Sequence, residues 1–157
     1  MSTDQFLSNR DLLKRVGMLD AAGQIHRSKP LQDPQAFHQL AGRLFELVTE
    51  PFDLVVVRDL AGDRLLGYSV GLLAGCPVSV SYDWEGLIES EAAGGQDVHE
   101  ALLVADTHFT NGSLQAAAVG LRQRGVRVVG AAVLVEQLSP AYDFNVWSLE
   151  QSSDLTA

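Results

Sequence analysis

Apolar residues recur along this chain in two patterns, at helical spacing in some segments and as short continuous runs in others. Apolar residues three to four positions apart line one face of a helix, whereas a short unbroken apolar run is typical of a strand covered on both faces. The helical spacing predicts helices over residues 7–16, 34–50, 65–73 and 114–124. The continuous runs predict strands over residues 53–57, 78–81, 101–104 and 126–135.

Residues that begin and end helices support these boundaries. Ser8 or Asn9 can cap the first helix, and Asp33 followed by Pro34 is a typical start for the second. Gly125 stands where a glycine commonly ends a helix. From the second helix onward, helices and strands alternate with short connections, apart from the longer segment between the strands over 78–81 and 101–104.

This alternation predicts an α/β fold, since strand–helix–strand units with short connections form right-handed crossovers in a parallel sheet. We expect a single domain over residues 1–157 with a doubly wound, mostly parallel sheet. Its expected parts are an N-terminal helix and an irregular segment (1–32), a core (33–136) and a C-terminal segment (137–157). Ligands of such sheets bind beyond the carboxyl ends of the strands. These ends predict candidate ligand-binding segments at residues 58–63, 82–96, 105–113 and from 136 onward.

Composition narrows the class of protein. Of the 157 residues, 46% are hydrophobic and 20% charged, as in ordinary globular domains. Cys76 is the only cysteine, so no internal disulfide can form. Of the four histidines, one lies in the 105–113 segment and the other three are scattered, so the spacing does not suggest a zinc site. We find no signal peptide and no apolar run of about 18 residues, and expect a cytoplasmic protein outside the membrane.

Charge is distributed unevenly. The net charge of −9 argues against nucleic-acid and anionic-membrane partners, which bind clustered Lys and Arg. Residues 65–121 contain no Lys or Arg at all. The same stretch contains the acidic residues Asp83, Glu85, Glu89, Glu91, Asp97, Glu100 and Asp106.

The segment 101–113, ALLVADTHFTNGS, carries the most suggestive chemistry. It is a predicted buried strand with Asp106 at its tip, and the loop that follows opens a helix. Backbone N–H groups at a helix N-terminus attract anions, and hydroxyl groups add further donors. Phosphate would be bound by Thr110, Asn111, Gly112 and Ser113. The same residues also fit a simple turn followed by a helix cap. The neighbouring His108 could equally well contact a ligand or face solvent in the loop.

This segment resembles the phosphoribosyl-pyrophosphate (PRPP) motif of type I phosphoribosyltransferases, in which an apolar strand, two acidic residues and a Thr-Thr-Gly-Gly-Ser/Thr loop precede a helix. The stretch PFDLVVVRDLAGDRLLGYSVGLLAGCPVSVSYD resembles the orotate branch in particular, and the likeness covers roughly residues 30–136. The resemblance implies the type I phosphoribosyltransferase fold with a short N-terminal hood segment, PRPP with Mg²⁺ as ligands, pyrimidine nucleotide metabolism and a homodimer. It gives Asp106 a ribose-binding and catalytic role, with no metal held by the protein alone.

The chain departs from the motif at several positions. Ala105 replaces the first carboxylate of the acidic pair, and Phe109 and Asn111 replace a Thr and a Gly of the phosphate loop. The turn that would hold pyrophosphate keeps a single glycine; its residues are Arg58, Asp59, Ala61 and Gly62. The loop over 83–96, which carries cations in orotate phosphoribosyltransferases, has none here.

These observations leave three hypotheses. The first is a phosphoribosyltransferase-like protein that binds a phosphorylated ribose or nucleotide at the Thr110–Ser113 loop with weak or no transferase activity. The second is an active, divergent phosphoribosyltransferase (a glycosyltransferase) that uses PRPP and Mg²⁺ in nucleotide metabolism. The third is a protein-interaction module with an empty pocket. Tyr82 and Trp84, after the second strand, could stack on a base or pack against a helix.

Overall fold

The computed structural model describes residues 7–84, 87–90, 98–107, 113–137 and 142–155. Within these residues six strands form one sheet in the order β3-β2-β1-β4-β5-β6. Neighbouring strands are parallel except β2 and β3, which pair antiparallel. The strands are β1 (Leu54–Arg58), β2 (Val78–Trp84), β3 (Leu87–Ser90), β4 (Glu100–Thr107), β5 (Arg127–Glu136) and β6 (Asn145–Gln151). The predicted α/β class with a mostly parallel sheet is confirmed.

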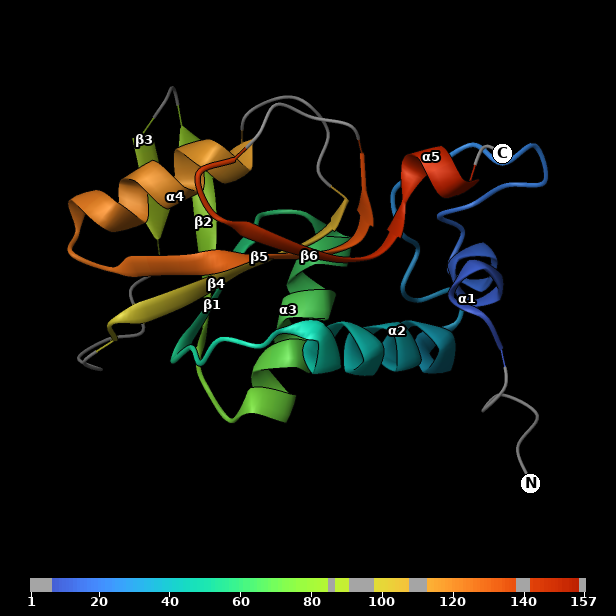
Figure 1. Cartoon of the computed structure of the whole chain (residues 1–157), viewed down its shortest axis with the longest axis horizontal. Coiled ribbons are helices and arrows are strands. Elements are labelled where there is room, and N and C mark those ends of the chain that lie inside the picture. Colours follow the sequence, from blue (N-terminus) through green and yellow to red (C-terminus); the bar gives the residue numbers. More distant parts are fainter. Residues whose placement is uncertain (1–6, 85–86, 91–97, 108–112, 138–141, 156–157) are drawn as a thin grey trace.

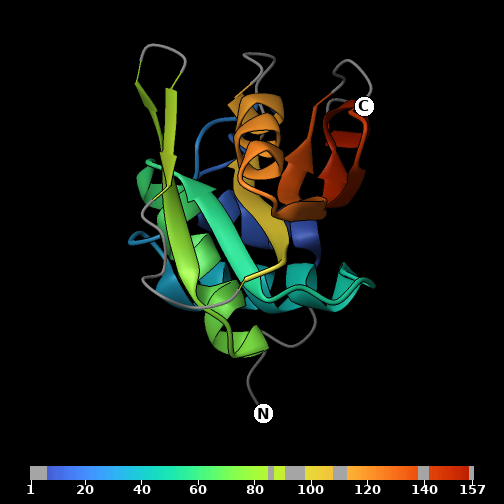
Figure 2. The ribbon, with the colours of Figure 1, turned by 90° about the vertical axis from the view of Figure 1, so that its left-hand side faces the viewer.

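Helices cover both faces of this sheet (Figures 1 and 2). Alternate residues of each strand point to opposite faces. On one face, Leu102 and Val104 of β4 join a core with the three N-terminal helices; on the other, Leu103 and Ala105 pack with the apolar residues of α4. The helices are α1 (Asn9–Arg15), α2 (Pro34–Leu47), α3 (Ala61–Ala74), α4 (Ser113–Gln123) and α5 (Ser152–Leu155).

The expected capping residues act as predicted. The Ser8 hydroxyl accepts from the Asp11 N–H, and the Asp11 carboxylate accepts in return from the Ser8 N–H, which closes a capping box at α1. Asp33 accepts from the Ala36 N–H at the start of α2, ahead of Pro34. The predicted starts of these helices are therefore confirmed to within two residues, whereas α2 ends at Leu47, three residues before the predicted end.

Other boundaries differ from the prediction. α3 begins at Ala61 rather than at Leu65, because its first turn carries buried polar contacts instead of the apolar spacing. β4 continues past Val104 to Thr107, since its ladder with β5 runs on to the pair Thr107–Val135. Ala105 and Asp106 thus lie inside the strand and not in a loop.

Two further regions were not predicted as regular structure. Part of the 83–96 segment, expected to be a loop, belongs to β2 and β3, which form an antiparallel pair at the sheet edge. The C-terminal segment contains β6 and α5. β6 is half-buried at the opposite edge of the sheet, which weakens the apolar pattern that would reveal a strand.

The segment between α1 and α2, residues 17–29, is called here the N-terminal strap. Among the described residues, its one ladder contact is the bridge between Leu19 and Ile25. It folds back on the chain through the N–H groups of His26 and Lys29, which donate to the carbonyls of Met18 and Val16. This irregular path agrees with the prediction for this segment. The strap brings its last residues to the carboxyl end of the sheet.

None of the described helices is long and apolar enough to cross a bilayer.

Candidate functional site

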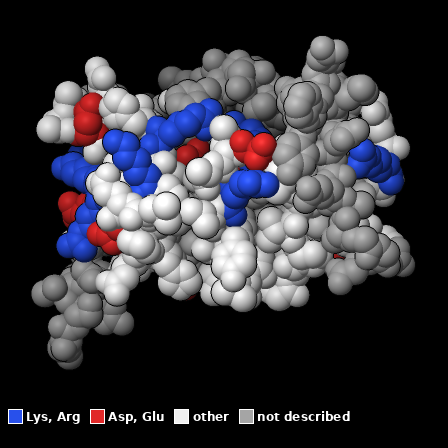
Figure 3. Space-filling model, turned by 180° about the vertical axis from the view of Figure 1, so that it is seen from behind, with Lys and Arg blue, Asp and Glu red and all other residues white. Residues whose placement is uncertain are grey.

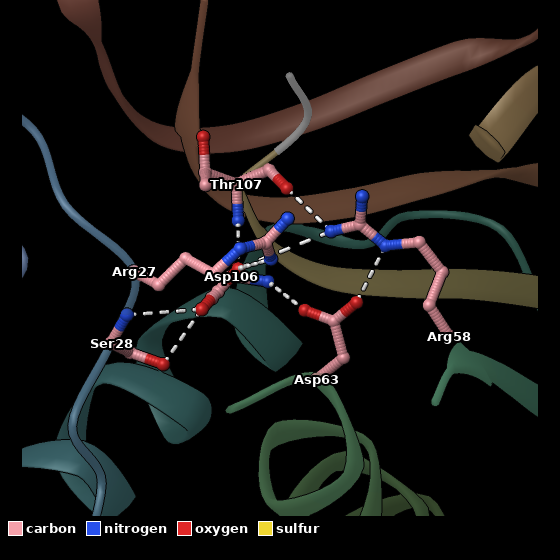
Figure 4. Close-up of polar contacts among 6 residues, drawn as sticks. All are labelled: Arg27, Ser28, Arg58, Asp63, Asp106 and Thr107. Atoms are coloured by element: carbon pink, nitrogen blue, oxygen red, sulfur yellow. Dashed lines mark hydrogen bonds and ion pairs between the residues drawn. The ribbon is translucent and has the colours of Figure 1, made fainter. Parts of the chain in front are cut away.

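A group of buried polar side chains lies where β1 and β4 end and α3 begins (Figure 4). The side chain of Asp106 points to the face covered by α3, in line with Leu102 and Val104, while Thr107 points to the α4 face with Ala105. This is the edge at which ligands of parallel sheets bind. It is therefore the candidate ligand-binding site.

Arg58 and Asp63 form a buried ion pair at its centre. Arg58 Nε donates to Asp63 Oδ2 at 2.6 Å, and Arg58 Nη2 donates to the Thr107 carbonyl at 2.6 Å. Exposed fractions are 8% for Arg58 and 0% for Asp63. Arg58 Nη2 also lies 4.0 Å from Asp106 Oδ1, so one guanidinium serves two carboxylates.

The Asp106 carboxylate is occupied by donors from its own chain. Its Oδ2 accepts from the Ser28 N–H at 3.1 Å and from the Ser28 hydroxyl at 2.8 Å. Its Oδ1 accepts from the Thr107 N–H at 2.6 Å and lies 3.9 Å from Arg27 Nη1. Only 2% of Asp106 is exposed, so the strap covers the group that the sequence suggested for ribose binding.

Gly62 makes this close approach of strap and strand end feasible. A Cβ at position 62 would lie 2.1 Å from Ser28 Oγ and 2.7 Å from Asp106 Oδ2, distances that real Cβ atoms do not show. The glycine that the sequence pointed to for pyrophosphate thus leaves room for Ser28.

Burial changes the acidity of Asp63. Loss of solvent raises the pKa of the Asp63 carboxyl to about 6; the Arg58 guanidinium opposes that rise, and the Asp106 charge adds to it. A carboxyl with a raised pKa in the folded state keeps its proton to higher pH than in the unfolded chain. Its contribution to stability is therefore greatest in acid and is lost as pH rises from about 4 to 6.

Asp63→Asn should remove this pH dependence. The difference in free energy of unfolding between wild type and Asp63→Asn should fall by roughly 3 kcal/mol between pH 4 and pH 7, the equivalent of about two pKa units. Urea unfolding of both proteins across this range measures it. Asp59→Asn is the matched control, because Asp59 is half-exposed and forms an ion pair with the exposed Arg64 at 3.4 Å. A difference that rises with pH would contradict the assignment.

The other predicted site residues have the following positions. Asp59 precedes α3, and Ala61 and Gly62 stand in its first turn. Ser113 is the first residue of α4. Thr110, Asn111, Gly112 and His108 lie outside the described residues, as do the side chains of Ser113, Tyr82 and Trp84. The roles assigned to these residues remain predictions.

Asp63 was missed by the sequence interpretation, although it accepts from the Asp106 N–H at 2.9 Å and joins β4 to α3. The only signal was an acidic residue in the first turn of a helix, which is common and nonspecific. Thr107 was also missed. Its hydroxyl is fully buried at the end of β4 on the α4 side, and it has no hydrogen-bond partner among the described residues.

Positive charge gathers beside this site. Figure 3 shows Lys and Arg side chains concentrated on one face, toward the end of the molecule that carries α1. Arg27 and Arg64, with side chains 43% and 48% exposed, belong to the strap and to α3. An acidic protein with a local positive field can still attract anionic ligands.

The carboxylates at the site do not suit a metal held by the protein alone. Mg²⁺ binds through oxygen ligands with near-octahedral geometry. Asp63 and Asp106 are already hydrogen-bonded within the chain, and the described residues contain no group of three or more candidate metal ligands.

Comparison with solved protein structures identifies the fold of this chain. No protein-family model matches the chain, and no curated protein matches it in sequence. Among solved structures, orotate phosphoribosyltransferase from Aeropyrum pernix has a TM-score of 0.77 at 18% identity, over 93% of this chain and 94% of that one. The Mycobacterium tuberculosis orotate phosphoribosyltransferase in complex with PRPP has a TM-score of 0.66 at 21% identity, over 95% and 99%.

Adenine phosphoribosyltransferase from Thermoanaerobacter pseudethanolicus is also similar, with a TM-score of 0.65 at 19% identity over 78% of this chain and 84% of that one. The chain therefore has the type I phosphoribosyltransferase fold, as the sequence resemblance implied. The likeness spans nearly the full length of the orotate phosphoribosyltransferases.

Proposed function

We propose that this chain is a phosphoribosyltransferase-like protein, related to the orotate branch, that binds a phosphorylated ribose or nucleotide and has weak or no transferase activity. The phosphate would bind at the Thr110–Ser113 loop. Support comes from α4, whose first residue is Ser113 and whose N-terminus follows the end of β4. Free N–H groups at such an end favour an anion.

The observation that carries the weak-transfer part of the proposal is the closed network of Arg58, Asp63, Asp106 and Ser28. Transfer from PRPP needs cations against the charge of the departing pyrophosphate. Arg58 is the one basic residue of the predicted pyrophosphate turn, and the Asp63 carboxylate already neutralises it in a buried pair. Residues 65–121 add no Lys or Arg.

An active, divergent phosphoribosyltransferase of pyrimidine metabolism is the second candidate. The observation in its favour is the pair of accessible cations, Arg27 and Arg64, at the carboxyl edge of the sheet. In that case PRPP would bring its own Mg²⁺, and a homodimer could add residues from a second subunit. A protein-interaction module is the outcome if no phosphorylated ligand binds.

Isothermal titration with PRPP and Mg²⁺, and then with orotidine monophosphate, tests the proposal. We expect binding of a phosphorylated ligand to wild type and none to Gly112→Val, because a side chain at Gly112 would keep phosphate from the loop backbone. Gly42→Val is the matched control, since an added Cβ at that helix position meets no atom within 4 Å. Unchanged binding by Gly112→Val, or no binding by wild type, would contradict the proposal.

A further inference from the structure

Ser28 presents two donors to one carboxylate oxygen. Its N–H and its hydroxyl both reach Asp106 Oδ2, and the strap approaches from outside the sheet to make this contact (Figure 4). Two neighbouring O–H groups of a ribose would meet a carboxylate in a similar way, since an ionised carboxylate is an acceptor only. The strap therefore occupies the acceptor that a ribose diol would use.

We propose that Ser28 competes with the hydroxyls of a bound ribose for Asp106, and so determines how strongly this site distinguishes ribose from dideoxyribose ligands. The inference rests on the proposed function, because it concerns the sugar of a ligand whose phosphate binds at the neighbouring loop.

The Asp106 carboxylate cannot accept hydrogen bonds from both Ser28 donors and both hydroxyls of a ribose at the same time. Oδ2 already has two donors, and Oδ1 accepts from Thr107 at 2.6 Å. Space is equally restricted, since Gly62 lies against both Ser28 Oγ and Asp106 Oδ2. An ionised carboxylate has about four acceptor positions, and these three hydrogen bonds leave about one of them open. Both hydroxyls of a ribose diol can therefore bind Asp106 only when a Ser28 donor leaves.

The hydroxyl is the part of Ser28 that can leave easily. The backbone on either side is held, because the N–H groups of His26 and Lys29 donate to Met18 and Val16 carbonyls at 2.8 and 2.7 Å. Rotation about the Ser28 side-chain bond moves Oγ away from Asp106 without moving this backbone. The backbone N–H of Ser28 then stays on Asp106 while a ligand hydroxyl takes the vacated position.

Affinities for uridine monophosphate (UMP) and 2′,3′-dideoxy-UMP, measured by titration on wild type and Ser28→Ala, test this competition. Wild type should bind the two nucleotides with affinities within about threefold of each other. Ser28→Ala should bind UMP about 10-fold more tightly than dideoxy-UMP, because a hydrogen bond to a charged group is then free to form. Ser28→Gly should behave in the same way and serves if Ser28→Ala folds poorly.

His26→Ala is the matched control. It changes the same strap, but its ring contacts Asp20 at 2.8 Å and not Asp106, so the UMP preference should remain that of wild type. Equal preference ratios in wild type and both Ser28 variants, or a strong UMP preference already in wild type, would overturn the inference alone. Failure of UMP and dideoxy-UMP to bind any of these proteins would overturn the inference, and failure of PRPP and orotidine monophosphate to bind as well would overturn the proposed function with it.

Discussion

Arg58→Met is expected to lower the free energy of unfolding by about 3–5 kcal/mol at pH 7, the usual cost of removing one partner from a buried ion pair. The variant leaves the Asp63 carboxylate with 0% exposure and no guanidinium, and the Thr107 carbonyl loses its donor from Arg58 Nη2. Methionine keeps most of the length of the side chain, so loss of packing adds little. Urea unfolding followed by circular dichroism measures the effect.

A matched variant distinguishes the cost of breaking a buried ion pair from the cost of removing an exposed positive charge. Arg64→Met removes a cation whose side chain is 48% exposed and which pairs with the half-exposed Asp59. It should cost at most about 1 kcal/mol, as exposed ion pairs generally do. Adding Asp63→Asn to Arg58→Met should recover part of the loss, because the buried charge is then removed. Equal costs for Arg58→Met and Arg64→Met would contradict the central role of the buried pair.

Pyrophosphate release from PRPP and orotate is expected to be slower than that of an orotate phosphoribosyltransferase by roughly 10⁴-fold or more, since each missing electrostatic contact costs on the order of 10²–10³ in rate. The missing contacts are the cations absent from residues 83–96, a free cation at the pyrophosphate turn, and the first carboxylate of the acidic pair, replaced by Ala105. A coupled pyrophosphate assay at saturating Mg²⁺, with the Mycobacterium tuberculosis enzyme as reference, measures the difference.

Ala105→Asp alone should not restore release. Ala105 is fully buried among the apolar residues between the sheet and α4, so a carboxylate there would lie on the face opposite Asp106 and would destabilise the core. Release by wild type at a rate near that of the reference enzyme would contradict the charge argument and favour the active transferase. Release gained by Ala105→Asp would contradict the assignment of the missing cations as the main defect.

The sequence revealed the fold because its main elements have strong local signals. Apolar runs such as 54–57 and 128–135 favour strands buried on both faces, since helices alternate with them. The start of α2 was equally clear from Asp33 and Pro34. Where local signals are weak, as in half-buried β6, the prediction failed.

The candidate site was only partly predictable. Asp106 was found because an acidic residue at the end of a buried strand is unusual, and its ribose-binding role remains a prediction. Asp63 was missed because nothing in its neighbourhood shows that it is fully buried. Burial of a charge is a property of the packed molecule, since it depends on groups far away in the sequence.

The chain order of apolar and polar residues therefore determined the α/β class, the parallel sheet and the edge at which a ligand would bind. Only the tertiary structure decided how the charged groups at that edge are used. Ser28 lies 78 positions from Asp106 in the sequence, and folding of the strap brings its hydroxyl within 2.8 Å of that carboxylate. Hydrogen bonds and ion pairs act over a few ångströms, so contacts between such distant residues exist only once the chain has folded.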